Sequence, residues 1–411
     1  MRDRQSKSGP LVGLKVIELA HVMAGPACGR MLSDLGADVI KLERPGGEDS
    51  RHMAPPYLGT DSAAYVMMNR GKRDICVDLK TETGRRVFLD LVKDADILIE
   101  NFRKGTMDRL GIGYDTLSAM NPGLIYCEIS GYGRTGPMAD EGGFDLMAQA
   151  MSGLMSFTGE GLGRPPVKVG APVGDIGAGM LATIGVLAAL QERQSSGHGQ
   201  RVDTSLFEAA LFQTLWQSAI YLASGDVPEA MGSAHPLDGP YQAFGTADDW
   251  IVIGAANQAN WLRLIKVMDA EALGDDPRFI DNPARMTNLT ALVEALTPIF
   301  KTDSAESWLQ RLAEGGVPAA PILSMDKVLN HPQTLARDMV VDIRHSDLGS
   351  TKTLGLPIKF SRTPGNVSGQ DTPRLGQHAR EVLREAGWHD DDIEKAFSER
   401  AISAADDPIL S

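Results

Sequence analysis

One aspartate of this sequence stands in a setting suited to covalent chemistry. Asp175 lies in the stretch KVGAPVGDIGAGM, with Gly174 and Gly177 close on either side and a long apolar run behind it. Glycines leave room for a bulky ligand to approach a carboxylate, and a helix N-terminus favours the ionised form. The segment therefore suits a nucleophile. Aspartate is also a preferred N-cap residue, so the residues alone leave both interpretations open.

A second candidate is a turn suited to phosphate. The residues AHVMAGPACG separate a predicted strand from a predicted helix, and helix N-termini attract anions. The dinucleotide fingerprint G-x-G-x-x-G is absent, which argues against a nicotinamide site, although Glu43 stands where such folds place a ribose-binding acid. The guanidinium of Arg44 suits a phosphate as a bidentate donor, but a lone arginine is more often a solvated surface residue.

Other kinds of site find little support in the sequence. No two histidines have the spacing of a helical metal motif such as H-E-x-x-H, so we expect no metal site. The three cysteines lie far apart without C-x-x-C spacing, which argues against a zinc site or a disulfide framework and favours a reducing cytoplasm. A G-x-S-x-G elbow is also missing, which leaves serine hydrolase chemistry unsupported.

Composition narrows the possible partners. The chain has 411 residues and a formal net charge of -14, whereas proteins that bind nucleic acids or anionic membranes usually present a basic face. We therefore expect neither partner. The start of the chain lacks the form of a signal peptide. The longest apolar run, residues 177–190, is too short to span a bilayer and predicts a buried helix instead.

Strands and helices alternate over the first half of the chain. This alternation predicts a mostly parallel sheet covered by helices. Thr81 is expected to cap one of the helices, with Val87, Phe88, Leu91 and Val92 on its buried face. The predicted strands are 14–19, 38–42, 96–100 and 124–129, and a helix is predicted over 26–35.

The second half predicts a smaller α/β domain. Residues 224–240 are rich in Gly, Pro, Ser and Ala, which is typical of a connector. Beyond them the pattern predicts a strand at 250–254 and helices at 261–268, 287–300 and 305–312. After Pro321 the chain becomes irregular, with a β-like stretch at 339–343 and a helical end at 377–386.

Many motifs, taken in order, resemble the class III CoA-transferase family (CaiB/BaiF), which includes formyl-CoA and carnitine CoA-transferases. The resemblance covers nearly the whole chain, so it is far more specific than any single motif. The motifs are LVGLKVIELAHVMAGPACGRMLSDLGADVIKLERP, GKRDICVDLK, DILIENFRKGTMDRLG, EISGYGRTGP, GGFDLMAQAMSG, KVGAPVGDIGAGM and GHGQRVDTSLFEAAL.

The resemblance implies an architecture that the hydrophobic pattern does not reveal. A Rossmann-like large CoA-binding domain would comprise residues 1–223 and, after the chain returns, residues 331–411. Residues 224–330 would form the linker and a small α/β domain. Two ring-like subunits would interlock as a homodimer, with the active site between one chain's large domain and the other's small domain.

The resemblance also implies an activity and a set of site residues. Asp175 would be the nucleophile that moves CoA from an acyl-CoA to a free carboxylic acid, through an aspartyl anhydride and an aspartyl-CoA thioester. Acyl-CoA is then a substrate, and no permanently bound cofactor is expected. The residues that correspond to the family's CoA contacts are Val22, Met23, Ala24, Arg44, Val77, Lys80, Asn101, Phe102, Arg103 and Arg109.

Two alternatives belong to the same fold. The similar α-methylacyl-CoA racemases need a histidine in a G-H-D motif as one of two bases, whereas this chain has Gly143, Phe144 and Asp145 there. A non-catalytic CoA-binding homologue is the other alternative, and the intact segment around Asp175 argues against it.

The choice of substrate is expected to depend on a loop before the small domain. Formyl-CoA:oxalate enzymes have a glycine run there, whereas this chain has His235 and Pro236. Relatives with H-P in this loop include several that use succinyl-CoA and a dicarboxylate or related acid, so succinyl-CoA is the expected donor. Candidate substrate contacts are His21, Phe144, Asp145 and His235.

Overall fold

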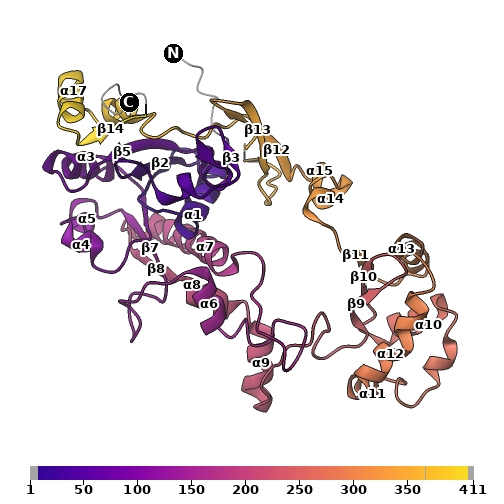
Figure 1. Cartoon of the computed structure of the whole chain (residues 1–411). Helices are drawn as coiled ribbons and strands as arrows, with labels where there is room; N and C mark the ends of the chain where they lie inside the picture. Colours follow the sequence, from indigo (N-terminus) through magenta and orange to yellow (C-terminus); the bar gives the residue numbers. More distant parts are fainter. Residues whose placement is uncertain (1–7, 366, 406–411) are drawn as a thin grey trace. The chain divides into compact units, whose positions relative to one another are not determined.

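The computed structural model describes residues 8–365 and 367–405 (Figure 1). Contacts divide the chain into two compact units. The larger unit comprises residues up to 154, residues 169–218 and residues from 332 onward. The smaller unit comprises residues 155–168 and 219–331. The larger unit is therefore built from three separate segments of the chain.

A seven-stranded sheet forms the centre of the larger unit, in the order β14-β5-β2-β1-β6-β7-β8. All of its pairs are parallel except that of β14 with β5. The predicted mixed α/β fold with a large parallel sheet is thus confirmed. The strands are β1 (Lys15–Glu18), β2 (Asp38–Glu43), β5 (Arg73–Val77), β6 (Ile97–Glu100), β7 (Ile125–Ser130), β8 (Arg201–Ser205) and β14 (Ile402–Ser403).

Helices cover both faces of this sheet (Figure 1). One face packs against helices from both ends of the chain in a single hydrophobic core that includes Ile17, Phe88 and Leu383. Thr81 caps the first of these helices as predicted, because its hydroxyl accepts the N–H of Gly84 at 2.9 Å. The helices are α3 (Glu82–Val92), α4 (Thr106–Arg109), α5 (Tyr114–Met120), α16 (Ala379–Glu385) and α17 (Asp390–Ser398).

The other face carries α1 (Ala24–Asp34) and α7 (Val173–Ser196), which cross each other closely. A Cβ atom at Gly179 would lie 2.7 Å from the Cβ of Ala27 and 2.8 Å from the carbonyl oxygen of Ala24. Real Cβ atoms do not approach so closely, so only glycine permits this crossing. As a result, the second turn of α7 lies beside the first turn of α1.

Helix α7 is longer than the apolar run that predicted it. It has 24 residues, and by length and composition it is the one helix among the described residues that would suffice to cross a membrane. One of its faces is buried and packs on α1, β7 and β8. The predicted helix is therefore present and longer than expected, but it is buried on one face only, and Met180 and Ile184 are exposed.

Shorter elements complete the larger unit. Helices α6 and α8 pack on each other and on α7, and the β-like stretch predicted near residue 340 is the first strand of a hairpin. These elements are η1 (Asp49–His52), β3 (Tyr57–Leu58), β4 (Asp61–Ser62), α2 (Ala63–Asn69), α6 (Asp145–Met151), α8 (Leu206–Phe212), α15 (Pro332–Ala336), β12 (Val340–His345) and β13 (Gly349–Leu354). Helix α9 (Leu215–Ser224) includes residues of both units.

The smaller unit has its own core, in which Trp261, Phe300 and Trp308 are buried. An antiparallel three-stranded sheet in the order β11-β10-β9 packs with several helices. Its strands are β9 (Tyr241–Gly245), β10 (Trp250–Gly254) and β11 (Ala319–Pro321). Its helices are α10 (Gln258–Val267), η2 (Glu271–Gly274), α11 (Asn282–Thr287), α12 (Leu289–Phe300), α13 (Ala305–Glu314) and α14 (Met325–Leu329).

Candidate active site

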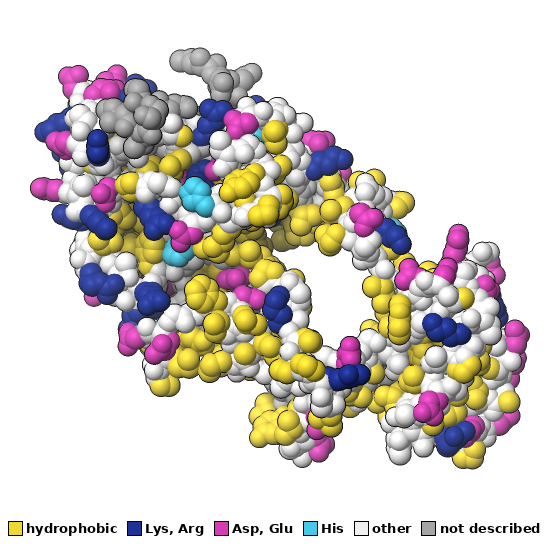
Figure 2. Space-filling model, viewed as in Figure 1, with side chains coloured by type: hydrophobic (Ala, Val, Ile, Leu, Met, Phe, Trp, Pro, Cys, Tyr) yellow, Lys and Arg dark blue, Asp and Glu magenta, His cyan; other side chains and the backbone are white. Residues whose placement is uncertain are grey.

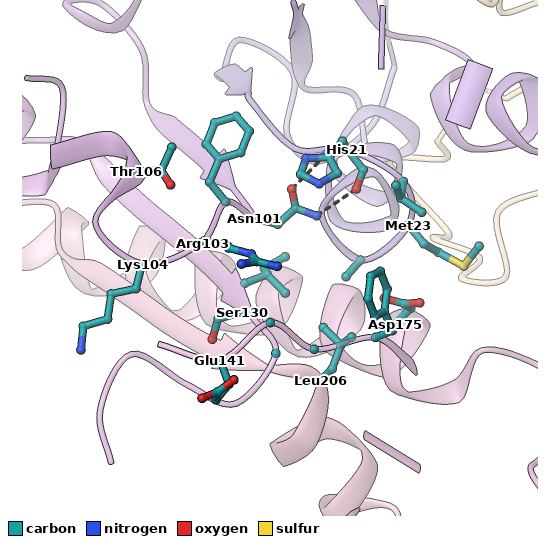
Figure 3. A pocket seen from close by; sticks show the side chains of 18 of the residues that line it. His21, Met23, Asn101, Arg103, Lys104, Thr106, Ser130, Glu141, Asp175 and Leu206 are labelled. Carbon is teal, nitrogen blue, oxygen red and sulfur yellow. Dashed lines mark hydrogen bonds between the residues drawn. The ribbon is translucent and has the colours of Figure 1, made fainter. Parts of the chain in front are cut away.

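The candidate site lies where the order of the parallel strands reverses. The chain continues from β1 toward β2 and β5 on one side, and from β6 toward β7 and β8 on the other. Open parallel sheets bind ligands at the carboxyl ends of the strands beside such a point. A cavity of about 630 Å³ is found there (Figure 3). Its lining includes His21, Val22, Met23, Ala24, Asn101, Phe102, Arg103, Phe144 and Asp175.

The turn after β1 forms one wall of this cavity. The N–H of His21 donates to the side-chain oxygen of Asn101 at 3.0 Å, and the Asn101 amide donates to the carbonyl oxygen of His21 at 2.9 Å (Figure 3). The next residue, Val22, has a φ of 64°, in the left-handed region that β-branched residues avoid. Helix α1 begins two residues later and directs its N-terminus toward the cavity.

Asp175 lies in the first turn of α7 and borders the cavity. The N-cap residue of this helix is Pro172, which offers no side-chain cap, and the N–H groups of the first turn are bound by Asp145 instead. The N-cap interpretation of Asp175 is therefore wrong. Because the carboxylate is not used as a cap, it is available to a ligand in the cavity that it borders.

The electrostatics of Asp175 differ from the expectation. Burial raises the pKa of its carboxyl to about 6, and the negative charge of Asp145 adds to the increase. The helix N-terminus was expected to favour the ionised form, but desolvation outweighs it. At pH 7 the carboxylate still predominates, and it is more basic than an exposed aspartate.

Asp145 is bound to the same helix terminus. Its Oδ1 atom accepts the N–H of Gly174 at 2.7 Å and that of Asp175 at 3.4 Å, while Oδ2 accepts from the amide of Gln149 at 2.7 Å. Asp145 is not among the residues that line the cavity. Asp145 instead contacts the backbone at the start of α7, and its negative charge raises the pKa of Asp175.

A close approach of two loops brings Phe144 to the cavity. A Cβ atom at Gly143 would lie 2.6 Å from the Cα of Gly131, which follows β7. Only a pair of glycines allows the two backbones to meet in this way. Phe144 is 72% exposed and lines the cavity, at the position where the racemase mechanism would need a histidine.

Basic side chains gather at the same cavity. Arg103 and Lys104 follow β6 and line the cavity, and in Figure 3 the guanidinium of Arg103 is drawn near its middle. Burial lowers the pKa of His21, so its imidazole is neutral at pH 7. Its ring lies 5.8 Å from the ring of Phe102, measured between centroids. The cavity thus offers cations next to a neutral aromatic surface.

The remaining residues expected at the site lie outside this cavity. Arg44 lines a smaller cavity of about 160 Å³, which shares His21 and Phe102 with the first. Val77 is the last residue of β5, and Lys80 lies three residues beyond it. Arg109 on α4 donates to the hydroxyl of Thr106, which lines the main cavity.

His235 belongs to the smaller unit. Its ring stacks on Tyr241 with 5.3 Å between centroids, and its Nδ1 atom lies 3.3 Å from the carboxylate of Asp238. The role of His235 as a substrate contact stays a prediction.

Several residues that line the cavity were not predicted from the sequence. Lys104 and Thr106 stand directly after the N-F-R run, and Ser130 ends β7 at the carboxyl edge of the sheet. These positions were available from the predicted strand ends. Glu141 and Leu206 had no such signal, since loop packing and the start of α8 bring them to the cavity. Among the described residues, no group of three or more His, Cys, Asp or Glu side chains is placed to hold a metal ion.

Comparison with known proteins gives relatives of nearly the same length. An acyl-CoA transferase of Fusarium pseudograminearum is 41% identical over 96% of this chain and 89% of its own. A succinate–glutarate CoA-transferase of Agrobacterium fabrum is 38% identical over 94% of this chain and 98% of its own. The crystal structure of a CaiB/BaiF family protein from Brucella suis superposes with a TM-score of 0.83, at 39% identity, over 92% of this chain and all of that one.

The family model described as CoA-transferase family III matches residues 11–379, a stretch that contains every element around the cavity. Together with relatives that match over nearly their whole lengths, this shows that the chain belongs to CoA-transferase family III.

Proposed function

We propose that the protein moves CoA from succinyl-CoA to a free dicarboxylic acid, with Asp175 as the nucleophile. One observation carries the catalytic assignment. Asp175 does not cap its helix, the pKa of its carboxyl group is raised, and it borders a cavity that also reaches the N-terminus of α1. A carboxylate of this kind is a better nucleophile than an exposed aspartate at the same pH, because basicity and nucleophilicity rise together.

The first half of the reaction loads CoA onto the enzyme. An oxygen of Asp175 attacks the thioester carbon, the C–S bond breaks, and a mixed anhydride and CoA thiolate result. The thiolate then attacks the aspartyl carbonyl carbon. The donor acid leaves as a carboxylate, and Asp175 carries CoA as a thioester.

The second half repeats these steps with the acceptor. The acceptor carboxylate attacks the carbonyl carbon of the aspartyl-CoA thioester, and the C–S bond breaks. The products of this step are a second mixed anhydride, between Asp175 and the acceptor, and CoA thiolate. Thiolate then attacks the acceptor's acyl carbon, so the new acyl-CoA forms and Asp175 is regenerated. Backbone N–H groups at the N-terminus of α1 suit the oxyanions of these steps, and closure of the site would protect the anhydride from water.

We assign CoA binding to the carboxyl edge of the seven-stranded sheet, from the turn after β1 to helix α4. The backbone of Val22, Met23 and Ala24 and the side chains of Asn101 and Phe102 would contact the part of CoA nearest the thioester. The cations Arg44, Lys80, Arg103 and Arg109, together with the β5 end at Val77, suit its phosphates and adenosine. The two adjoining cavities, which share His21 and Phe102, support an extended ligand here.

The proposed substrates rest on the relatives and on local charge. The similar Agrobacterium fabrum protein is named a succinate–glutarate CoA-transferase, and both of those acids carry a second carboxylate. Lys104 at the cavity suits that extra charge. His21, Phe144 and Asp145 are proposed to shape the acyl site, and His235 to approach it from the small domain of a partner subunit.

A homodimer is part of the proposal. In it, the larger unit serves as the CoA-binding domain and the smaller unit as the domain that completes the partner's site. An apolar face on α6, α7 and α8 supports it, and Figure 2 shows hydrophobic side chains gathered over this region. The exposed residues of this face are Phe144, Leu146, Met147, Met151, Met180, Ile184, Leu211 and Phe212. Apolar patches of this kind mark association surfaces.

We further propose that the enzyme works in the cytoplasm. All three cysteines are free and buried, which is the usual state in a reducing compartment.

The test is mass spectrometry of the purified protein after incubation with succinyl-CoA, with and without borohydride, mapped to the peptide that contains Asp175. We expect a CoA adduct at Asp175, and transfer of CoA to glutarate when that acid is added. The Asp175→Asn variant should form no adduct. Asp115→Asn, which changes an aspartate in the first turn of α5 instead, is the matched control and should behave like the wild type.

Three outcomes would redirect the proposal. An adduct with another acyl-CoA but none with succinyl-CoA would correct the donor. Absence of any adduct, together with solvent deuterium at the α-carbon of a 2-methylacyl-CoA, would favour a racemase. Absence of both would favour a non-catalytic CoA-binding protein.

A further inference from the structure

A buried glutamate lies beneath the turn that follows β1. Glu48 precedes η1 and is 5% exposed. Its Oε2 atom accepts the N–H of Val22 at 2.6 Å, and its Oε1 atom lies 2.9 Å from the ammonium group of Lys41. One oxygen of the carboxylate therefore accepts a hydrogen bond from the turn, and the other is ion-paired with the cation of β2.

The turn needs such support. Val22 has a φ of 64°, and a β-branched side chain makes this backbone conformation unfavourable. Its surroundings must therefore impose the conformation. On the preceding residue, Asn101 binds both the N–H and the carbonyl oxygen of His21, and Glu48 binds the next N–H along the chain. Together these side chains fix consecutive backbone groups just before α1.

Glu48 is one end of a fully buried chain of charges. Lys41 lies 3.1 Å from Glu18 and also donates to the carbonyl oxygen of Ala20 at 2.8 Å, and Lys72 lies 2.7 Å from Glu18. Two cations thus balance two anions. Buried ion pairs of this kind are often no more stabilising than apolar side chains of equal volume. Fold stability alone therefore gives little reason for a glutamate at this position, whereas the Val22 conformation gives one.

We propose that Glu48 is a positioning residue for CoA transfer, which holds Val22 in its left-handed conformation so that the N-terminus of α1 faces the acyl-CoA beside Asp175. The inference rests on the proposed function of this cavity. Glu48 does not line the main cavity, although it borders the smaller adjoining one. Its contact with the turn is the hydrogen bond from the backbone N–H of Val22, and through that bond it acts on the main cavity.

The chemistry of the contact makes glutamine a sharp test. Both partners of the Glu48 carboxylate are donors, and a glutamine side chain has one acceptor oxygen and a donor amide. Glu48→Gln can therefore satisfy Val22 or Lys41 but not both. Glu48→Asp keeps the charge that Lys41 needs and shortens the side chain, so it withdraws the oxygen from Val22 while leaving the buried charges balanced.

The experiment compares steady-state transfer and the rate of adduct formation at Asp175 in these variants. We expect Glu48→Gln and Glu48→Asp to raise KM for succinyl-CoA and slow adduct formation by about 10- to 100-fold, with KM for the acceptor unchanged. Adding Val22→Gly to Glu48→Gln should restore much of the loss, because glycine adopts a positive φ without help. Rescue of this kind is not expected of a merely structural glutamate.

The matched control is Asp34→Asn, which breaks a buried ion pair with Arg70. It should lower the melting temperature and leave the kinetic constants near those of the wild type. The positioning role is overturned if wild-type protein forms the adduct while both Glu48 variants keep KM for succinyl-CoA and adduct rates within about 2-fold. Failure of the wild type to form any adduct would instead overturn the proposed function.

Discussion

Asn101 and His21 exchange two hydrogen bonds across the gap between β6 and β1, at 3.0 and 2.9 Å. The side-chain amide of Asn101 imitates a peptide group of a neighbouring strand and extends the sheet ladder past the point where the strands end. The turn after β1, which faces the cavity, is thereby held to the end of β6, on the other side of the point where the strand order reverses.

This tie gives a first prediction. Asn101→Ala should raise KM for the acyl-CoA about 10-fold, because two hydrogen bonds of about 1 kcal/mol each no longer hold the turn. Asn121→Ala is the control. Asn121 is also half-buried and binds two backbone oxygens, of Val92 and Ala95, away from the cavity. Steady-state kinetics should separate the two variants, although thermal unfolding should show similar losses of stability. Equal KM values would contradict the role of the tie.

A second prediction concerns pH. The pKa of Asp175 is raised to about 6, by burial first and by the charge of Asp145 second. Because the ionised form is the nucleophile, kcat/KM should fall as pH drops through about 6. Asp145→Asn removes the neighbouring negative charge, so the pKa of Asp175 decreases and the acid limb moves to lower pH. Dividing the kcat/KM of the variant by that of the wild type at each pH removes the effect of substrate ionisation, because both enzymes use the same substrate. An unmoved limb would show that Asp145 does not affect the ionisation of Asp175.

A third prediction links the same carboxylate to stability. Asp175 has a higher pKa in the folded chain than when unfolded, so its charge opposes folding above pH 6 and the penalty disappears as pH falls toward 4. Asp175→Asn should therefore raise the free energy of unfolding at pH 7.5 by about 1 kcal/mol, allowing for solvent screening. Denaturant unfolding at pH 7.5 and pH 4.5 measures this, and the gain should shrink at the lower pH. A gain that persists unchanged at pH 4.5 would point to another cause.

The apolar face of α6, α7 and α8 gives a fourth prediction. Ile184 is 61% exposed in this face, and burial of an aspartate there would leave an unpaired charge in the dimer interface. Ile184→Asp should yield a monomer, as measured by light scattering on a sizing column. A transfer assay of the same sample should find no activity. Val12→Asp, at an exposed aliphatic residue outside these helices, should leave the dimer intact. A wild-type monomer with full activity would disprove the dimer.

The strands around the site could be predicted from sequence where they carry apolar runs. β1, β2, β6 and β7 were found because buried parallel strands are apolar on both faces. β5 and β8 were missed, since Arg73, Asp74 and Asp203 interrupt the pattern. The structure pairs Arg73 with Asp38, and Asp74 accepts the N–H of Gly376. These partners come from remote segments, which local periodicity does not reveal.

The site was predicted in part for the same reason. Its turn and its aspartate stand directly after a strand and at the start of a helix, where local signals are strong. The contact of Gly131 with Gly143 and the support of Val22 by Glu48 depend on tertiary packing. The raised pKa of Asp175 depends on burial, which became measurable only in the folded chain.

The pairing of β14 with β5 places Ile402 against Val77. During synthesis, the ribosome must therefore extend the chain by about 325 residues, from Val77 to Ile402, before the open edge of β5 acquires its last partner. At about 5–20 residues per second, that edge stays unprotected for on the order of tens of seconds. Unpaired edges recruit other strands, so the nascent chain needs shielding from its neighbours until β14 has emerged.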